Sequence, residues 1–249
     1  MTDSLRAIVR AAALVPSPLA KYRPEPGRHE VHGDVALTAA GLPGPDFNYV
    51  AVVGPTPPAR VFALADAFYG DPHGYSVVVE VEAARPLDDE LRARGWRLDE
   101  EEPALALAAL PAAPPPPPDG LAIRQVTDEA GLEDFLAVSE TGRRHVPSLV
   151  AALDPDVGLF VGYVDGRAVA TSRLSRLGDV AEIMGVVADP AYRRRGYGTA
   201  LTWAAVAGAA ARGCRAVTLT ASPLGYPVYV RMGFAPVCTF RTYLPPEAS

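Results

Sequence analysis

The sequence contains one lysine, two cysteines and no run of about 18 apolar residues. Two cysteines are too few for a disulfide framework or a cysteine-rich zinc site, so Cys214 and Cys238 are expected to be reduced, structural thiols. The absence of a long apolar run excludes an ordinary transmembrane helix. Arginines interrupt the apolar positions of residues 5–15, which predicts a first helix rather than a secretion signal. A cytoplasmic location is therefore expected.

The chain also lacks the basic excess that is typical of nucleic-acid-binding proteins. Its formal net charge is −6, and the whole acidic excess lies within the first 110 residues. In the remainder acidic and basic residues balance, and three arginines stand together at 193–195. Neither nucleic acid nor a membrane is an expected partner. Abundant Ala, Arg and Pro with a single lysine suggest a GC-rich bacterial genome.

Proline is concentrated at one place. Residues 111–120 include five consecutive prolines, Pro114 to Pro118, which cannot join a helix interior or a central strand and which favour a stiff spacer. This predicts a domain over 1–110, a linker over 111–120 and a second domain over 121–249. A proline-rich surface loop within one domain is the alternative.

One segment of the second half predicts an anion site. The β-branched run Val180 to Val187 predicts a strand, and an Ala-rich segment from Gly198 to Gly213 predicts a helix. A helix that begins at a turn rich in Gly and Arg presents free N–H groups and its positive dipole end, which suit a phosphate. A solvated Arg-rich turn is the alternative.

Two common phosphate loops do not fit this segment. A dinucleotide fingerprint requires a third glycine where the chain has Leu201. A P-loop requires a lysine after its last glycine, and the only lysine is Lys21. The pattern that remains is Arg-x-x-Gly-x-Gly, formed by Arg193, Gly196 and Gly198.

A second motif follows at Tyr229-Val-Arg-Met-Gly-Phe234, between a predicted helix over 222–232 and a predicted strand over 236–243. Together the two motifs resemble those of the GCN5-related N-acetyltransferases, the GNAT superfamily, over about residues 121–244. The resemblance implies an α/β (α+β) fold and acetyl-CoA as cosubstrate. It further implies direct transfer of an acetyl group to a primary amine, either a small molecule or a peptide N-terminus, and it allows a homodimer. A non-catalytic acyl-CoA-binding sensor of the same fold is the alternative.

The first half carries a fainter version of the second motif. Leu91 to Trp96 repeats the order of a helix end, a glycine turn and an aromatic residue, but with leucine in the place of Tyr229. Its pattern predicts strands over 47–53, 75–81 and 103–110 and helices over 59–69 and 87–94. This predicts a tandem protein of two GNAT-like domains, each a mixed, mostly antiparallel sheet flanked by helices. The first would be a degenerate copy that cannot bind CoA in the family's manner; an unrelated small α+β domain is the alternative.

The resemblance also implies which residues contact acetyl-CoA. Gly185 is expected to mark a bulge in the strand before the loop. The expected cofactor-binding residues are Val186, Val187, Arg193, Arg194, Arg195, Gly196, Tyr197, Gly198, Thr199, Ser222 and Tyr226.

Two residues are expected to be catalytic. Glu182, the charged side chain on an otherwise apolar strand, matches the family's general base; an anchor for the substrate ammonium and a structural role, solvated or paired with Arg173, stay open. Tyr229 matches the general acid toward the CoA sulfur, with a buried packing role as the alternative and Tyr226 as the alternative phenol.

Other polar residues give weaker signals. Residues 143–145, Arg-Arg-His, lie in the region that would shape the acceptor pocket, although a solvated turn fits them equally. His29 and His32 do not form His-Glu-x-x-His and have no evident third ligand, so no metal site is predicted.

Overall fold

The structure is a computed structural model of the 249-residue chain, and it describes residues 2–22, 27–45, 47–70, 74–111, 113–139 and 146–246. The strands are β1 Arg28–Val31, β2 Val35–Ala39, β3 Asn48–Val52, β4 Ser76–Glu80, β5 Arg97–Ala108, β6 Ala122–Gln125, β7 Val157–Val164, β8 Arg167–Leu177, β9 Val180–Ala188, β10 Ala216–Thr220 and β11 Ala235–Leu244. The α-helices are α1 Thr2–Ala13, α2 Pro58–Tyr69, α3 Arg85–Ala93, α4 Glu129–Val138, α6 Leu149–Ala152, α7 Tyr197–Ala211 and α8 Tyr226–Arg231. The 3₁₀ helices are η1 Pro18–Tyr22 and η2 Pro190–Tyr192.

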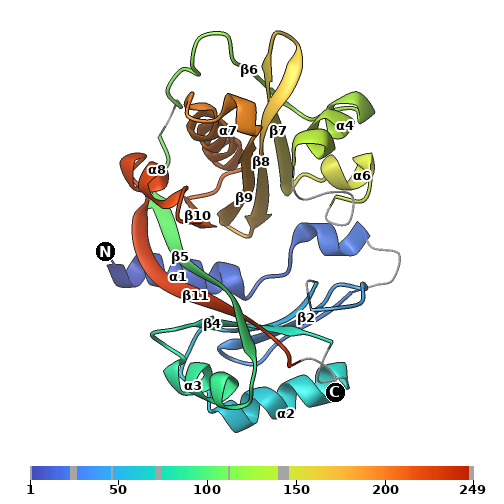
Figure 1. The fold of residues 1–249 in the computed structure, drawn as a ribbon, viewed down its shortest axis with the longest axis vertical. Coiled ribbons are helices and arrows are strands. Elements are labelled where there is room, and N and C mark those ends of the chain that lie inside the picture. The colour runs from blue at the N-terminus through green and yellow to red at the C-terminus, as the bar shows by residue number, and fades with distance from the viewer. Residues whose placement is uncertain are drawn as a thin grey trace.

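The strands form one 11-stranded sheet in the order β1-β2-β3-β4-β11-β5-β10-β9-β8-β7-β6. Within the described residues, β3 pairs parallel with β4 and β9 with β10, and the other pairings are antiparallel. This confirms the mixed, mostly antiparallel α/β architecture. The first and last parts of the chain interleave at its centre, because β5 lies between β10 and β11 while β11 lies between β4 and β5. In Figure 1 these two long strands join the upper and lower parts of the molecule.

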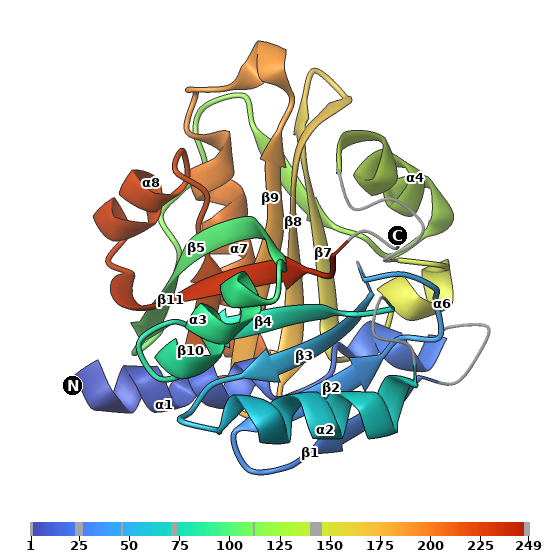
Figure 2. The same cartoon turned by 60° about the horizontal axis from the view of Figure 1, so that its bottom comes forward.

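Both halves of the chain follow the same order of elements. Three antiparallel strands are followed by a helix, a strand parallel to the third, a second helix and a long strand. The first half realises this order as β1 to β5 with α2 and α3, which Figure 2 brings forward, and the second as β7 to β11 with α7 and α8. The described part of the proline segment, residues 111 and 113–120, contains neither helix nor strand. The degenerate copy and the division at 111–120 stay predictions.

Helix α7 packs on one face of the strands β7 to β9 because its inner positions are small or aliphatic. Leu201, Ala205 and Ala209 are buried there, and the Ser172 hydroxyl of β8 donates a hydrogen bond of 2.8 Å to the Leu201 carbonyl. The helix begins at Tyr197, one residue before the predicted start, because Gly196 adopts φ 81° as its N-cap. This left-handed conformation suits glycine, and it fixes where the helix dipole points.

Helix α1 covers the opposite face of the central strands. Its residues Leu5, Ile8 and Val9 share a hydrophobic core with Ala104 and Ala106 of β5. Two arginines of α1 reach the fully buried Glu80 at the end of β4: Arg10 through a bidentate contact and Arg6 at 3.5 Å. A buried carboxylate requires such partners, so this cluster fixes α1 across the strands shared by both halves.

Strand β5 is longer than the sequence predicts, since it begins at Arg97 rather than at 103. Five of the six residues 97–102 are charged and Leu98 is the exception, so their pattern gives no periodic apolar signal. They form a strand nevertheless because β11 pairs with them along Arg97 to Glu102. A long-range partner therefore decides the conformation where local propensity does not.

Polar contacts also connect the N-terminal segment to the second half of the chain. The lone lysine, Lys21, lies 2.5 Å from the buried Asp154, which also accepts a hydrogen bond of 2.6 Å from Tyr22.

Cys214 and Cys238 are buried free thiols, and burial raises the pKa of Cys238 to about 12. No helix in the described part of the chain has both the length and the apolar character needed to span a membrane.

Candidate functional site

The first turn of α7 presents unsatisfied backbone donors. The first hydrogen bond within the helix runs from the Ala200 N–H to the Gly196 carbonyl, at 3.0 Å. The N–H groups of Tyr197, Gly198 and Thr199 therefore have no acceptor inside the helix, and no side chain caps them. These donors and the positive end of a 15-residue helix dipole form an anion-binding environment.

A cavity of about 680 Å³ opens in front of these donors. Ten of the residues expected to bind acetyl-CoA or to act on it lie in its wall: Val186, Val187, Arg193, Arg194, Gly196, Tyr197, Gly198, Thr199, Ser222 and Tyr229. Six more, which the sequence did not single out, complete the lining: Ala188, Tyr192, Leu224, Gly225, Val228 and Arg231. For Arg231 the available signal was its place inside the motif Tyr229 to Phe234.

The three consecutive arginines lie in different environments. Arg193 and Arg194 line the cavity, whereas Arg195 stacks over the Tyr192 ring with its guanidinium 5.3 Å from the ring centroid. Arg194 adopts φ 61°, an uncommon conformation for a side chain larger than glycine. The Arg193 Nε donates a hydrogen bond of 3.2 Å to the Ala188 carbonyl at the end of β9.

Strand β9 bulges where the sequence places its glycine. Thr171 of β8 pairs with Val187 and Arg173 with Met184, so one residue of β8 faces two of β9, Gly185 and Val186. Gly185 has φ 59°, which confirms the expected bulge.

Strands β9 and β10 separate after Glu182, just before this bulge. Their parallel pairing extends only from Val180–Ala216 to Glu182–Thr218, although both strands continue. A gap therefore opens between them, next to the bulge.

Tyr229 is buried in the wall of the 680 Å³ cavity, against Phe234 at 5.8 Å between ring centroids. Burial raises the pKa of its phenol, a hydrogen bond with Thr202 opposes the increase, and the charge of Glu102 adds to it. The phenol is therefore protonated at neutral pH and can donate a proton. Gly225 leaves room for the ring, because a Cβ there would lie 2.9 Å from its Cε2 atom.

Glu182 faces the other side of the sheet. Its neighbours Ala181 and Ile183 belong to the core beneath α7, so strand alternation directs Glu182 toward the α1 face, where Val180 packs. Burial raises the pKa of Glu182, and the charge of Arg173 opposes this. The two expected catalytic residues thus lie on opposite faces of the sheet, on either side of the gap between β9 and β10.

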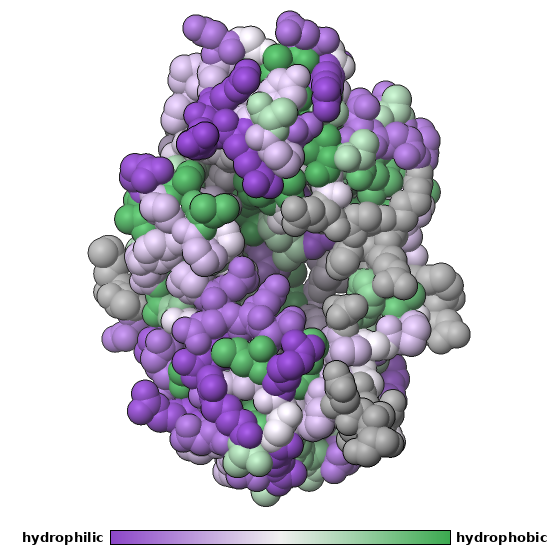
Figure 3. Space-filling view, in the orientation of Figure 1, coloured by the Kyte–Doolittle hydropathy of each residue, from purple (hydrophilic) through white to green (hydrophobic). Residues whose placement is uncertain are grey.

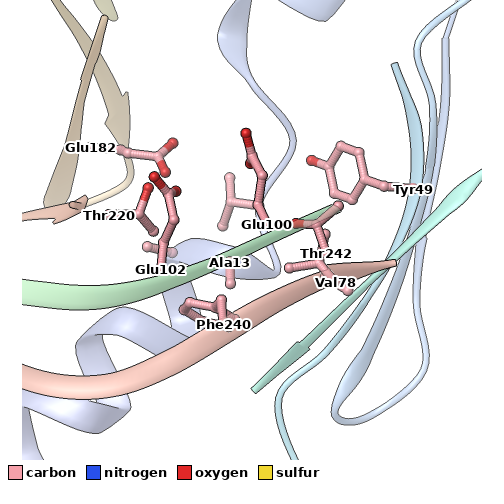
Figure 4. Close-up of a pocket in the computed structure, with 12 residues that line it drawn as sticks. Ala13, Tyr49, Val78, Glu100, Glu102, Glu182, Thr220, Phe240 and Thr242 are labelled. Atoms are coloured by element: carbon pink, nitrogen blue, oxygen red, sulfur yellow. The ribbon is translucent and has the colours of Figure 1, made fainter. Parts of the chain in front are cut away.

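Glu182 lines a second cavity, of about 240 Å³. Figure 3 shows the hollow between the upper and lower parts of the molecule, and Figure 4 shows the side chains inside this cavity. Its walls come from both halves of the chain: Ala12, Ala13, Val15, Tyr49, Ala51, Val78, Glu100, Glu102, Glu182, Thr220, Phe240 and Thr242. Except for Glu182, the sequence did not indicate these residues, because only the interleaving of β5 and β11 brings them together.

The remaining candidates lie elsewhere. Tyr226 begins α8 and packs at the edge of the core beneath α7 rather than in the 680 Å³ cavity. His29 contacts the Thr38 hydroxyl at 2.9 Å and the Leu14 carbonyl at 3.1 Å, and His32 contacts Glu30 at 3.0 Å. The segment 143–145 lies outside the described residues.

Comparison with known proteins agrees with this geometry. Residues 124–234 match the model of the acetyltransferase (GNAT) family, and no curated protein matches the sequence. A GCN5-related N-acetyltransferase from Kribbella flavida has a similar structure, with 23% identity, a TM-score of 0.73 and coverage of 89% of this chain and 90% of that one. A GCN5-related N-acetyltransferase-like protein from Streptococcus suis matches at 17% identity and TM-score 0.60, over 99% and 100% of the two chains. A tandem GNAT protein from the clavulanic acid biosynthesis pathway matches at 14% identity and TM-score 0.58, over 99% and 96%. At these identities the structural likenesses show the fold.

Proposed function

Because residues 124–234 match the acetyltransferase (GNAT) family, we propose that this chain is an acetyl-CoA-dependent N-acetyltransferase acting on a primary amine. One observation carries the proposal. The donors at the start of α7, two arginines and the Tyr229 phenol share a single cavity beside the gap between β9 and β10. An anion-binding helix end and a proton donor in one cavity suit a phosphate-bearing acyl carrier whose leaving group needs a proton.

The residues present fit acetyl-CoA. The free N–H groups of Tyr197 to Thr199, with Arg193 and Arg194, would hold its diphosphate, because charged acceptors bind most strongly to such donors. A cavity of about 680 Å³ lies within the usual size range of cofactor sites. Bound acetyl-CoA would supply the activated acetyl group.

The transfer requires two proton movements. A bond forms between the amine nitrogen and the acetyl carbon while the bond from that carbon to sulfur breaks, so the nitrogen loses one proton and the sulfur gains one. Glu182 takes the first proton, directly or through water, and Tyr229 donates the second. Backbone N–H groups around the bulge at Val186 and Val187 would stabilise the negative charge on the acetyl oxygen.

The environments of the two side chains support these roles. Burial raises the pKa of Glu182, which makes its carboxylate a stronger base toward an ammonium group. Burial also raises the pKa of Tyr229, which keeps the phenol protonated until a thiolate forms beside it. Their positions on opposite faces of the sheet allow the amine and the acyl carrier to approach the gap from different sides.

Release of free thiol from acetyl-CoA in the presence of a panel of primary amines tests the proposal. Thiol release that requires both the protein and an amine is expected, together with an acetylated product of the matching mass. The variant Tyr229→Phe removes the proposed proton donor and should slow this release. Tyr226→Phe is its matched control, because Tyr226 does not line the cavity. Binding of acetyl-CoA without transfer to any amine would overturn the enzymatic proposal and favour a sensor.

A further inference from the structure

The 240 Å³ cavity has walls of two kinds. Three carboxylates, from Glu100, Glu102 and Glu182, and the hydroxyl groups of Tyr49, Thr220 and Thr242 form its polar part. Ala13, Val78 and Phe240 contribute an apolar part. In Figure 4 the side chains of Glu182, Thr220 and Glu102 gather on one side, and the Tyr49 hydroxyl points toward Glu100. Such a mixture fits an aliphatic ligand with cationic ends.

Strand alternation separates the acids of β5. Glu101 faces away from the cavity and accepts a hydrogen bond of 2.6 Å from Arg241. Glu100 and Glu102 share the face of Ala104 and Ala106, which α1 covers, and they continue that face past the end of the helix into the cavity. Two residues apart on a strand, their backbone positions are about 7 Å apart.

Glu100 of this cavity is exposed and Glu102 and Glu182 are half-buried, and all three differ in their partners from the fully buried acids. Glu80 is bound by Arg10, Asp88 by Arg241 and Tyr243, and Asp154 by Lys21 and Tyr22. Among the described residues, Glu100, Glu102 and Glu182 make no hydrogen bond or ion pair that meets the usual distance limits.

The electrostatics of the cavity follow from this arrangement. Desolvation, followed by the charges of Glu102 and Asp99, raises the pKa of Glu100. Desolvation likewise raises the pKa of Glu182, and Glu182 in turn raises the pKa of Tyr49, after the larger effect of burial on that phenol. A bound cation would relieve the repulsion, and Arg173 is the charged group of the protein that already acts on Glu182.

We propose that this cavity, shared by the two halves of the chain, is the acceptor site and that it selects aliphatic primary amines carrying a second cationic group. The inference rests on the proposed acetyltransferase function. Glu102 and Glu100 hold the distal ammonium, and the apolar wall of Ala13, Val78 and Phe240 contacts the carbon chain. The reacting amine lies at Glu182 and Thr220, where β9 and β10 separate toward the opposite cavity. The first half of the chain therefore acts in substrate selection, through Glu100, Glu102 and Tyr49.

Calorimetric titration of the whole protein with a diaminobutane that has an amine at each end tests the inference without acetyl-CoA. Butylamine, which has the same carbon chain and one charge, is the matched ligand. The diamine is expected to bind at least tenfold more tightly than butylamine. Glu102→Gln and Glu100→Gln should each weaken diamine binding at least tenfold. Glu101→Gln, which makes the same charge change on the other face of β5, should leave it unchanged.

A separate titration with acetyl-CoA distinguishes a failure of the acceptor-site inference from a failure of the proposed acetyltransferase function. Unchanged acetyl-CoA binding in Glu102→Gln is expected, because the two cavities lie on opposite faces of the sheet. If the diamine binds no better than butylamine, or if Glu101→Gln weakens it as much as Glu102→Gln, the acceptor inference is wrong while the acetyl-CoA site stands. If the diamine binds as expected but acetyl-CoA does not bind, the proposed function fails instead.

Discussion

Replacing Gly198 by alanine should stabilise the fold and weaken the binding of acetyl-CoA at the same time. Gly198 lies in the first turn of α7 and its backbone does not adopt a positive φ. A Cβ at this position would meet a single neighbour, the Cγ1 atom of Val186 at 3.8 Å, which is ordinary van der Waals contact. The protein itself therefore has room for the methyl group.

The substitution should have opposite effects on stability and on the affinity for acetyl-CoA. Alanine in a helix loses less conformational entropy on folding than glycine, so the free energy of unfolding should rise by about 0.4–1 kcal/mol. The methyl group would stand in the cavity in front of the α7 donors and would keep the diphosphate away from them. Loss of one hydrogen bond to a charged group costs about 1.5–3 kcal/mol, which corresponds to a rise in Kd of about 10- to 150-fold.

Urea denaturation and calorimetric titration with acetyl-CoA measure the two effects on the same samples. Gly131→Ala is the control, because Gly131 lies near the start of α4 and does not line the cavity. Its affinity for acetyl-CoA should equal that of the unmodified protein. A Gly198→Ala variant that folds normally and binds acetyl-CoA with unchanged affinity would refute the assignment of the phosphate site.

Three further predictions concern the catalytic pair and the interleaved fold. Tyr229→Phe should lower kcat about 100-fold in steady-state kinetics, while Kd for acetyl-CoA stays nearly constant. An equal loss of kcat in Tyr226→Phe would contradict this. Because burial raises the pKa of Glu182 above its ordinary value of 4.5, ionised Glu182 costs stability at neutral pH and not below that value. Glu182→Gln should therefore raise the melting temperature at neutral pH and give no gain below about pH 4; a gain that is equal at all pH values would argue against a buried charge. A fragment of residues 119–249 lacks β5, which lies between β10 and β11, so it should fold only when co-expressed with residues 1–118; a folded isolated fragment, detected by circular dichroism, would show that β5 is dispensable.

Local patterns predicted the parts of this protein that depend on neighbouring residues. The helix that follows Gly196, the bulge at Gly185 and the strand around Glu182 are encoded within one short segment, where glycine, proline and β-branched residues have direct conformational effects. The loop arginines could be named but not distinguished, because the stacking of Arg195 on Tyr192 depends on the turn that η2 forms.

The acidic cavity lay beyond the reach of the sequence because it depends on pairings between distant segments. The exposed edge strand β1 and the polar start of β5 lack an apolar period, so neither could be predicted from alternation. The placement of Glu100 and Glu102 opposite Glu182 follows only once β5 has inserted between β10 and β11. Until that topology is known, the run of three glutamates looks like an ordinary solvated segment.

A crystal structure of the protein with acetyl-CoA bound would show whether the first turn of α7 holds the diphosphate. The diphosphate is expected at the N–H groups of Tyr197 to Thr199, and the acetyl group at the bulge of β9, on the side of the gap toward Glu182. The sulfur should lie within hydrogen-bond distance of the Tyr229 hydroxyl. A diphosphate bound elsewhere, or an acetyl group directed away from the gap between β9 and β10, would rule out this site for acetyl transfer.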